Sequence, residues 1–145
     1  RHAEAVGADW LILQPPAVGT YAAEEYLAFF TRVMQATALP TAIQNAPQYL
    51  GRGLSDDDIA RLRRANPNFT LIKSEATAAE CRHLIALAPG LAVFNGRGGQ
   101  EMVACLDAGC AGFLLAPDLI DYGVRVMALW AAGDRAGALA LHEAT

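Results

Sequence analysis

Apolar residues gather in five short runs along the chain, and residues that favour turns border each run. Short apolar runs bounded by Gly, Pro, Asn or Asp are typical of strands that lie inside a protein. The pattern therefore predicts five strands, at Asp9–Gln14, Thr41–Asn45, Phe69–Lys73, Leu91–Asn95 and Gly112–Ala116.

A stretch with the spacing of an amphipathic helix follows each of these strands. The predicted helices cover residues 22–37, 55–65, 77–88, 98–108 and 119–131, and a further short helix covers 134–143. Ser55 stands before three aspartates, which indicates an N-cap followed by an acidic first turn. Thr77 and Glu80 have the spacing of a capping box.

The strict alternation of strands and helices predicts the fold class. Nearly continuous apolar strands separated by helices are typical of a parallel α/β sheet covered by helices. Such a sheet is either a (β/α)8 barrel or an open, doubly wound sheet. No linker or internal boundary divides residues 1–145. Because five units are fewer than eight and the chain opens inside a helical pattern without a methionine, we expect a single fragment of a barrel, with the N-terminal strands missing.

Composition and charge narrow the class of protein. With 54% hydrophobic and 18% charged residues, the 145-residue chain can bury a core and is not disordered. A net charge of -4 without any Lys/Arg cluster argues against a nucleic-acid partner. No apolar stretch is long enough to span a membrane and no signal peptide is present, so we expect no membrane partner and a cytoplasmic location. Cys81, Cys105 and Cys110 lack the spacing of metal ligands and are interpreted as core thiols.

Polar residues follow the apolar part of most predicted strands. Gln14 ends the first strand, Gln44 and Asn45 end the second, and Asn95 ends the fourth. Lys73 and Glu75 stand at the end of the third strand. Parallel α/β enzymes build their active sites at the carboxyl ends of their strands. These residues therefore predict a site for a small molecule at that end of the sheet.

Lys73 is unusual because it lies at the end of an apolar strand. Side chains alternate along a strand, so Leu71, Lys73 and Glu75 point to one side and Ile72 to the other. The lysine has three explanations: a structural ion pair with Glu75, a fixed cation for an anionic substrate, or an amine nucleophile. Burial disfavours the ammonium form, and a neutral amine can form a Schiff base with a ketone. Position alone leaves all three open.

Four segments in order carry a resemblance to a known family: GADWLILQPP, LPTAIQNAPQYLG, FTLIKSEAT and VFNGRGGQEMVACLDAGCAGFL. Together they resemble the dihydrodipicolinate synthase/N-acetylneuraminate lyase superfamily of class I aldolases and dehydratases. The resemblance covers essentially the whole chain and implies a partial (β/α)8 barrel, about strands four to eight with their helices. It also implies that the full-length protein is a lyase and a homo-oligomer, with tetramers common in the family. The first strands of the barrel would be missing from residues 1–145, so we expect this fragment to be inactive.

The resemblance assigns roles to particular residues. In the family, a lysine on the sixth strand forms a Schiff base with a 2-oxo acid such as pyruvate, and Lys73 matches it. The loop after the seventh strand contacts the far end of the substrate, and Asn95, Gly96 and Arg97 match it. In physical terms, free N–H groups and an arginine at a helix start would suit an oxyanion or hydroxyls. The imine itself is the electron sink, so no metal and no cofactor is expected.

At two positions the sequence differs from the family pattern, and both differences bear on which substrate we expect. A tyrosine that relays protons usually ends the fifth strand of the family, and Gln44 stands there instead. An amide cannot act as a general acid or base, but Gln44 and Asn45 could orient a carbonyl or hydroxyl. Tyr49 occupies the place of an arginine that holds a carboxylate. Glu75, on the same face as Lys73, is the candidate proton carrier, or else only the ion-pair partner of the lysine.

The pair Lys73-x-Glu75 with Gln44 resembles the branch that dehydrates 2-keto-3-deoxy sugar acids. The predicted function is therefore a Schiff-base-forming hydro-lyase acting on such a 2-oxo acid, with Lys73 and Glu75 catalytic. The alternatives are a pyruvate-dependent aldolase, a 2-oxo acid binding paralogue without catalysis, and a doubly wound domain that uses NGRGG as an anion-binding loop.

Overall fold

The structure, a computed structural model, describes residues 2–16, 19 and 21–144. Its strands form one sheet in the order β1-β2-β3-β4-β5, and every neighbouring pair is parallel. Their bounds are β1 Leu11–Leu13, β2 Thr41–Asn45, β3 Phe69–Ser74, β4 Ala92–Asn95 and β5 Gly112–Phe113. A doubly wound sheet reverses its strand order at a switch point. The sequential order of the described strands is that of a barrel and contradicts the doubly wound alternative.

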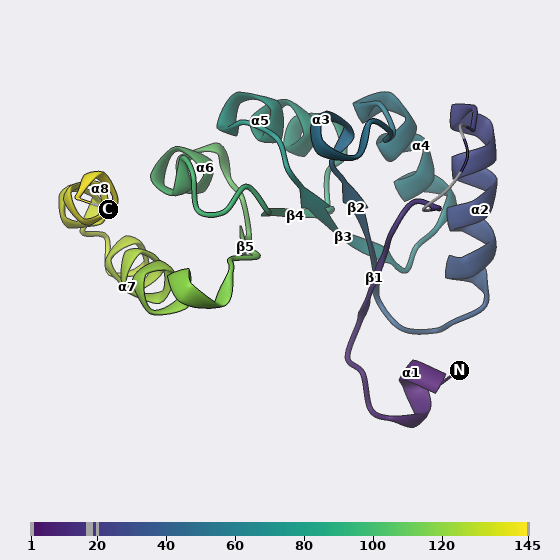
Figure 1. Ribbon diagram of the computed structural model, residues 1–145, viewed down its shortest axis with the longest axis horizontal. Helices are drawn as coiled ribbons and strands as arrows, with labels where there is room; N and C mark the ends of the chain where they lie inside the picture. The colour runs from purple at the N-terminus through teal and green to yellow at the C-terminus, as the bar shows by residue number, and fades with distance from the viewer. Residues whose placement is uncertain (1, 17–18, 20, 145) are drawn as a thin grey trace.

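The described helices have the bounds α1 His2–Ala5, α2 Ala23–Gln35, α3 Pro47–Leu50, α4 Asp56–Ala65, α5 Ala78–Leu87, α6 Met102–Ala108, a 3₁₀ helix η1 Pro117–Leu119, α7 Ile120–Ala131 and α8 Arg135–Glu143. Helices α2, α4, α5 and α6 lie along one side of this sheet, and α1 lies apart from them next to the N-terminus (Figure 1). Figure 1 shows α2, α4, α5 and α6 in an arc along the strands, with α7 and α8 continuing the arc beyond β5. Helix α1 lies in the helical pattern with which the chain opens, whereas the short helices α3 and η1 were not predicted.

Alternation along the strands separates the core from the open face. Ile43, Ile72 and Val93 are buried in a hydrophobic core that the strands share with α2, α4, α5 and α6. On the opposite face Gln44 of β2, Lys73 of β3 and Phe94 of β4 are register partners, and each is only half-buried. The predicted division, with Ile72 toward the helices and Lys73 away from them, is confirmed.

Two predicted helix starts are confirmed by their capping bonds. The Ser55 hydroxyl accepts a hydrogen bond from the Asp58 N–H at the start of α4, at 3.2 Å. At the start of α5 the Glu80 carboxylate accepts from the Thr77 N–H at 2.7 Å, and the Thr77 hydroxyl accepts from the Glu80 N–H at 3.3 Å. These reciprocal bonds satisfy two N–H groups that have no partner inside the helix.

The helix after β4 begins later than predicted. The sequence pattern placed its start at residue 98, but α6 begins at Met102. Gly98, Gly99 and Glu101 have φ angles of 62°, 83° and 56°, which belong to the left-handed region and not to a helix. The NGRGG segment is therefore a turn ahead of the helix, and its N–H groups are not those of a helix terminus.

None of the described helices is both long enough and apolar enough to cross a membrane. The three cysteines are buried and outside any disulfide, which confirms the expectation of core thiols.

Candidate active site at the carboxyl ends of the strands

Lys73 and Glu75 form an ion pair on the open face of the sheet. The Lys73 Nζ lies 2.9 Å from the Glu75 Oε1, and the side chains are 20% and 13% exposed. Main-chain pairing continues past the end of β3, because the Glu75 N–H donates to the Asn45 carbonyl at 3.1 Å. This extended backbone keeps residues two apart on one face, as alternation predicts.

Gln44 joins this pair from the neighbouring strand. Its Nε2 donates to the Glu75 Oε1 at 2.6 Å, and its Oε1 accepts from the Gln14 Nε2 at 2.7 Å. A continuous set of polar contacts therefore crosses the ends of β1, β2 and β3. Gln14 is polar in the sequence pattern, but nothing in that pattern linked it to Gln44.

The Glu75 carboxylate has one oxygen engaged and one available. Its Oε1 meets both Lys73 and Gln44, whereas no described residue forms a hydrogen bond with its Oε2. A cavity of about 120 Å³ adjoins Glu75 between β2, β3 and the helices, and it also contacts Asp56 and Glu80. This volume is below the range typical of ligand pockets.

Gly96 lies directly against the lysine. A Cβ added at Gly96 would lie 2.6 Å from the Lys73 Cε and 3.2 Å from the Glu75 Cγ. The Gly96 N–H donates to the Ser74 carbonyl at 2.9 Å, which fixes the main chain in this close position. The absence of a side chain at residue 96 is thus required for the observed placement of both charged residues.

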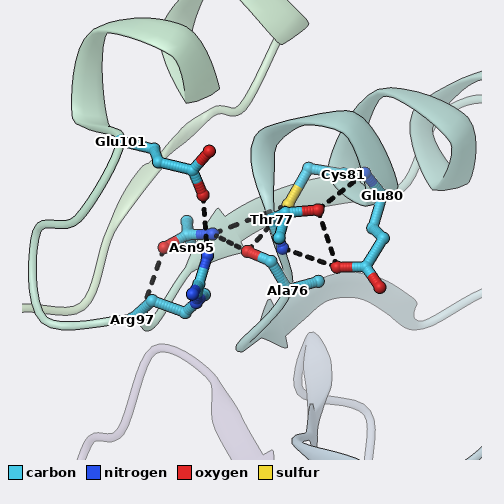
Figure 2. Close-up of polar contacts among 7 residues, drawn as sticks. All are labelled: Ala76, Thr77, Glu80, Cys81, Asn95, Arg97 and Glu101. Carbon is cyan, nitrogen blue, oxygen red and sulfur yellow. Dashed lines mark hydrogen bonds and ion pairs between the residues drawn. The ribbon is translucent and has the colours of Figure 1, made fainter.

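Asn45 and Asn95, both predicted to bind substrate, use their amides to hold loops. The Asn45 Nδ2 donates to the Leu54 carbonyl at 3.0 Å and its Oδ1 accepts from the Leu54 N–H at 2.9 Å. Asn95 is 1% exposed; its Nδ2 donates to the Ala76 carbonyl at 2.8 Å and its Oδ1 accepts from the Arg97 N–H at 3.0 Å (Figure 2). Contact between these two side chains and a substrate stays a prediction. The sequence pattern did not predict the hydrogen bonds by which they hold the neighbouring loops.

Arg97 has partners of its own. Its Nη1 lies 2.6 Å from the Glu101 Oε2, and Figure 2 draws this ion pair. The side chain of Tyr49, which is 60% exposed on α3, and then the charge of Glu101 raise the pKa of Arg97 above its ordinary value. The ion pair with Glu101 neutralises part of the positive charge of the Arg97 guanidinium.

A further residue joins two loops that border this face. The Arg52 guanidinium donates from Nη1 to the Pro16 carbonyl at 2.8 Å and to the Gly19 carbonyl at 3.3 Å. Its Nε donates to the Leu50 carbonyl at 3.2 Å. An arginine in a loop has no sequence signature for such a role, so sequence reasoning did not find it.

The described residues contain no group of three His, Cys, Asp or Glu side chains placed to hold a metal ion. His83 is exposed, and His142 is half-buried with its Nδ1 at 2.7 Å from the Tyr122 hydroxyl.

Parallel strands in sequential order, with a lysine–glutamate pair at their carboxyl ends, define part of a (β/α) barrel with a candidate active site. The family model described as Dihydrodipicolinate synthetase family matches residues 1–145. The chain belongs to this family, and the predicted partial barrel, about strands four to eight, is confirmed.

Particular relatives agree with this assignment. The chain is 32% identical over 150 residues to a 4-hydroxy-tetrahydrodipicolinate synthase of Acidiphilium cryptum. It is 26% identical over 152 residues to a probable 2-dehydro-3-deoxy-D-pentonate aldolase, YjhH, of Escherichia coli. Each alignment covers 99% of this chain and 50% of the relative, so the chain spans about half the length of the curated relatives it matches.

A solved structure shows the same fold. The prophage protein YagE of Escherichia coli K12, of the dihydrodipicolinic acid synthase family and in complex with pyruvate, superposes with a TM-score of 0.90. Its sequence identity is 23%, and the match covers 98% of this chain and 50% of YagE. At this identity the likeness supports the fold alone.

Proposed function

We propose that the protein is a Schiff-base-forming lyase that dehydrates a 2-keto-3-deoxy sugar acid. The observation that carries the proposal is the 2.9 Å contact between the Lys73 Nζ and the Glu75 Oε1 on the open face of the sheet. An amine beside a carboxylate, at the end of a barrel strand, has the parts needed for imine formation and proton transfer.

The first steps use the lysine and the carboxylate together. Glu75 accepts a proton from the Lys73 ammonium, and the neutral amine attacks C2 of the 2-oxo acid. The C2 oxygen leaves as water, and an iminium links Lys73 to the substrate. Gln44 holds the Glu75 Oε1 by its 2.6 Å hydrogen bond, so in this proposal the second carboxylate oxygen, Oε2, is the one that exchanges protons with the substrate.

The elimination follows from the positive charge of the iminium. The Glu75 Oε2 removes a proton from C3, and the electron pair of that C–H bond moves toward the iminium nitrogen to give an enamine. The enamine then expels the C4 hydroxyl, which takes up the proton that Glu75 removed from C3 and leaves as water. Hydrolysis of the remaining imine releases the product and restores the Lys73 amine. Because the iminium is the electron sink, the proposal includes no metal and no organic cofactor.

A second candidate is aldol cleavage of the same class of substrate. It is favoured by the 26% identity to a relative named as a probable 2-dehydro-3-deoxy-D-pentonate aldolase. In that reaction the C3–C4 bond breaks after the iminium has formed, and pyruvate is released. Both candidates share Lys73 and the imine, and they differ in which bond to C4 breaks.

We propose a cytoplasmic homo-oligomer, a tetramer as is common in the family, whose partner is a small 2-oxo acid and not nucleic acid or a membrane. Substrate groups beyond C3 would meet Arg97, Tyr49 and the turn that follows Asn95. The substrate carboxylate would be held by strands outside residues 1–145.

Borohydride trapping of the full-length protein tests the proposal. Incubation with pyruvate or 2-keto-3-deoxy-pentonate and reduction should add the acid's mass, less one oxygen, to the peptide that carries Lys73. Lys73→Arg is the matched control: it keeps the charge, cannot form the imine, and should give no adduct. A folded protein that binds the acid without any adduct would overturn the Schiff-base lyase.

Product analysis separates the two candidates. A dehydratase returns a product that keeps every carbon of the substrate, whereas an aldolase returns pyruvate and an aldehyde. With Glu75→Gln, we expect the turnover rate to fall by at least about 100-fold, the usual contribution of a general base. Unchanged turnover in Glu75→Gln would leave Glu75 as an ion-pair partner alone.

A further inference from the structure

Three hydrogen-bonding side chains follow Lys73 across the sheet in a single line. Lys73 contacts the Glu75 Oε1 at 2.9 Å, Gln44 donates to the same oxygen at 2.6 Å, and Gln14 donates to Gln44 at 2.7 Å. Because β1, β2 and β3 are successive strands, this line runs from the lysine to the edge strand β1.

The charges at one end fix the direction of every hydrogen bond in the line. An ammonium group only donates, and an ionised carboxylate only accepts. Gln44 must therefore turn its NH₂ group to Glu75, which leaves its oxygen to face Gln14. That oxygen only accepts, so Gln14 must in turn present its NH₂ group. The side-chain oxygen of Gln14 is the group left over, and no described residue donates to it.

We propose that Gln14 is a specificity-determining residue whose side-chain oxygen accepts a hydrogen bond from a hydroxyl group of the 2-oxo acid bound at Lys73. The proposal rests on the proposed function, since it places the substrate by its imine. Gln14 is exposed at the same end of the sheet as the lysine. Adjacent strands lie about 4.8 Å apart, so Gln14 starts roughly 10 Å from β3 across the sheet. The lysine side chain, a sugar-acid chain and the glutamine side chain together span this separation.

An oriented acceptor favours one kind of ligand group. A hydroxyl can donate to the Gln14 oxygen, whereas a carboxylate or a phosphate would place oxygen against oxygen. A methyl or methylene group would leave the amide oxygen without a partner after water is displaced. The chemistry at this position therefore selects a polyhydroxylated chain, and it does so through the orientation that Glu75 imposes on Gln44.

A matched pair of ligands and a matched pair of variants test this role in the full-length protein. 2-Oxopentanoate and 4,5-dihydroxy-2-oxopentanoate share one carbon chain and differ in their hydroxyls alone. Gln14→Met keeps the length of the side chain and removes its hydrogen bonds. Half-saturation is measured by borohydride trapping and, independently, by the ligand-dependent shift in melting temperature.

We expect the wild-type protein to bind the dihydroxy acid more tightly than 2-oxopentanoate. In Gln14→Met, half-saturation for the dihydroxy acid should rise about 3- to 10-fold, the range of one neutral hydrogen bond, and that for 2-oxopentanoate should change less than about twofold. In Gln14→Glu a carboxylate faces the Gln44 oxygen and repels it, so Gln44 turns and releases Glu75, whereas the uncharged side chain of Gln14→Met causes no such repulsion. That variant should slow adduct formation with both acids, which a role confined to the substrate hydroxyl would not do.

The outcomes that overturn the proposal are separate from those that overturn the lyase. Equal effects of Gln14→Met on both acids, or no effect on either, would remove the hydroxyl contact. A wild-type protein without preference for the dihydroxy acid would do the same. Absence of any covalent adduct would instead overturn the Schiff base, while the melting-temperature shifts would still report whether Gln14 distinguishes the two acids.

Discussion

Gly96 connects the backbone after β4 with the position of the lysine. A methyl group there would lie 2.6 Å from the Lys73 Cε, closer than carbon atoms approach without displacement. We expect Gly96→Ala to push the lysine away from its position and to slow adduct formation with pyruvate by at least about 10-fold. Borohydride trapping as a function of time measures this rate. An unchanged rate would show that the lysine chain bends aside without losing its reactive position.

Gly98→Ala is the matched control from the same turn. A Cβ at Gly98 would meet no atom within 4 Å, but its φ of 62° is costly for alanine. This variant should lose about 1 kcal/mol of unfolding free energy and keep the trapping rate of the wild type. Comparison of the trapping rates of Gly96→Ala and Gly98→Ala thus separates the effect of backbone strain from that of displacing the lysine.

Alternation along strands predicted part of the site. It placed Lys73 and Glu75 on one face because residues two apart share a side, and the 2.9 Å contact is consistent with it. Gln44 and Asn45 were both expected to meet substrate, yet consecutive residues of a strand point to opposite sides. Gln44 reaches Glu75, whereas Asn45 bonds to the main chain of Leu54. Contacts between strands, such as Gln14 with Gln44, depend on register and cannot be read from one strand.

Among the helices, α5 has the N-terminal signal that is clearest in the sequence, the capping box of Thr77 and Glu80. Hydrogen bonds from the Thr77 main chain and then from its hydroxyl hold the pKa of Glu80 below the ordinary 4.5. A lowered pKa means that the ionised carboxylate stabilises the folded state. This contribution is complete above pH 4.5 and is lost as the pH falls through the lower pKa of the folded protein.

We expect Glu80→Ala to lower the unfolding free energy by about 1 kcal/mol at pH 7, and by less as the pH falls below about 4.5. Urea unfolding of the full-length protein at a series of pH values measures the difference. Glu143→Ala, an exposed carboxylate at the end of α8, should cost less than about 0.5 kcal/mol at each pH. A Glu80→Ala deficit that stayed constant with pH would show that packing, and not the charge, matters at this position.

The start of α6 shows where local patterns fail. Apolar spacing from residue 98 onward fits a helix, but the turn at Gly98 and Gly99 and the φ of 56° at Glu101 delay it to Met102. Glu101 accepts this unfavourable backbone while its carboxylate pairs with Arg97 at 2.6 Å. The ion pair between Arg97 and Glu101 thus accompanies a left-handed backbone conformation at Glu101, which helix propensities do not predict.

For the whole molecule, the alternation of strands and helices predicted the parallel sheet but left its strand order open. A barrel and a doubly wound sheet share the same local units, and they differ only in which strands become neighbours. The order β1-β2-β3-β4-β5 decides between them. Which strands become neighbours depends on long-range contacts between their apolar faces. The periodicity of the sequence does not reveal these contacts, and the strand order was predicted from the resemblance to a family.

The open ends of this sheet lead to a prediction about the polypeptide of residues 1–145 produced alone. Among the described strands, β1 and β5 each pair on one side only. Next to β5, an apolar hollow of about 380 Å³ includes Phe113, Leu115 and the α7 residues Ile120 and Val124, which are 49% and 62% exposed. Unpaired strand edges and exposed apolar patches promote association. The polypeptide should therefore self-associate.

Light scattering after size-exclusion chromatography measures this association across a range of concentrations. Val124→Lys places a charge in the hollow and should shift the polypeptide toward the monomer. Val6→Lys is the matched control, because Val6 is 67% exposed but does not line the hollow, and it should leave the association as in the unmodified polypeptide. Equal effects of the two variants would assign the association to general charge, and a monomer throughout would show that the β5 side of the sheet is stable in water without a covering layer.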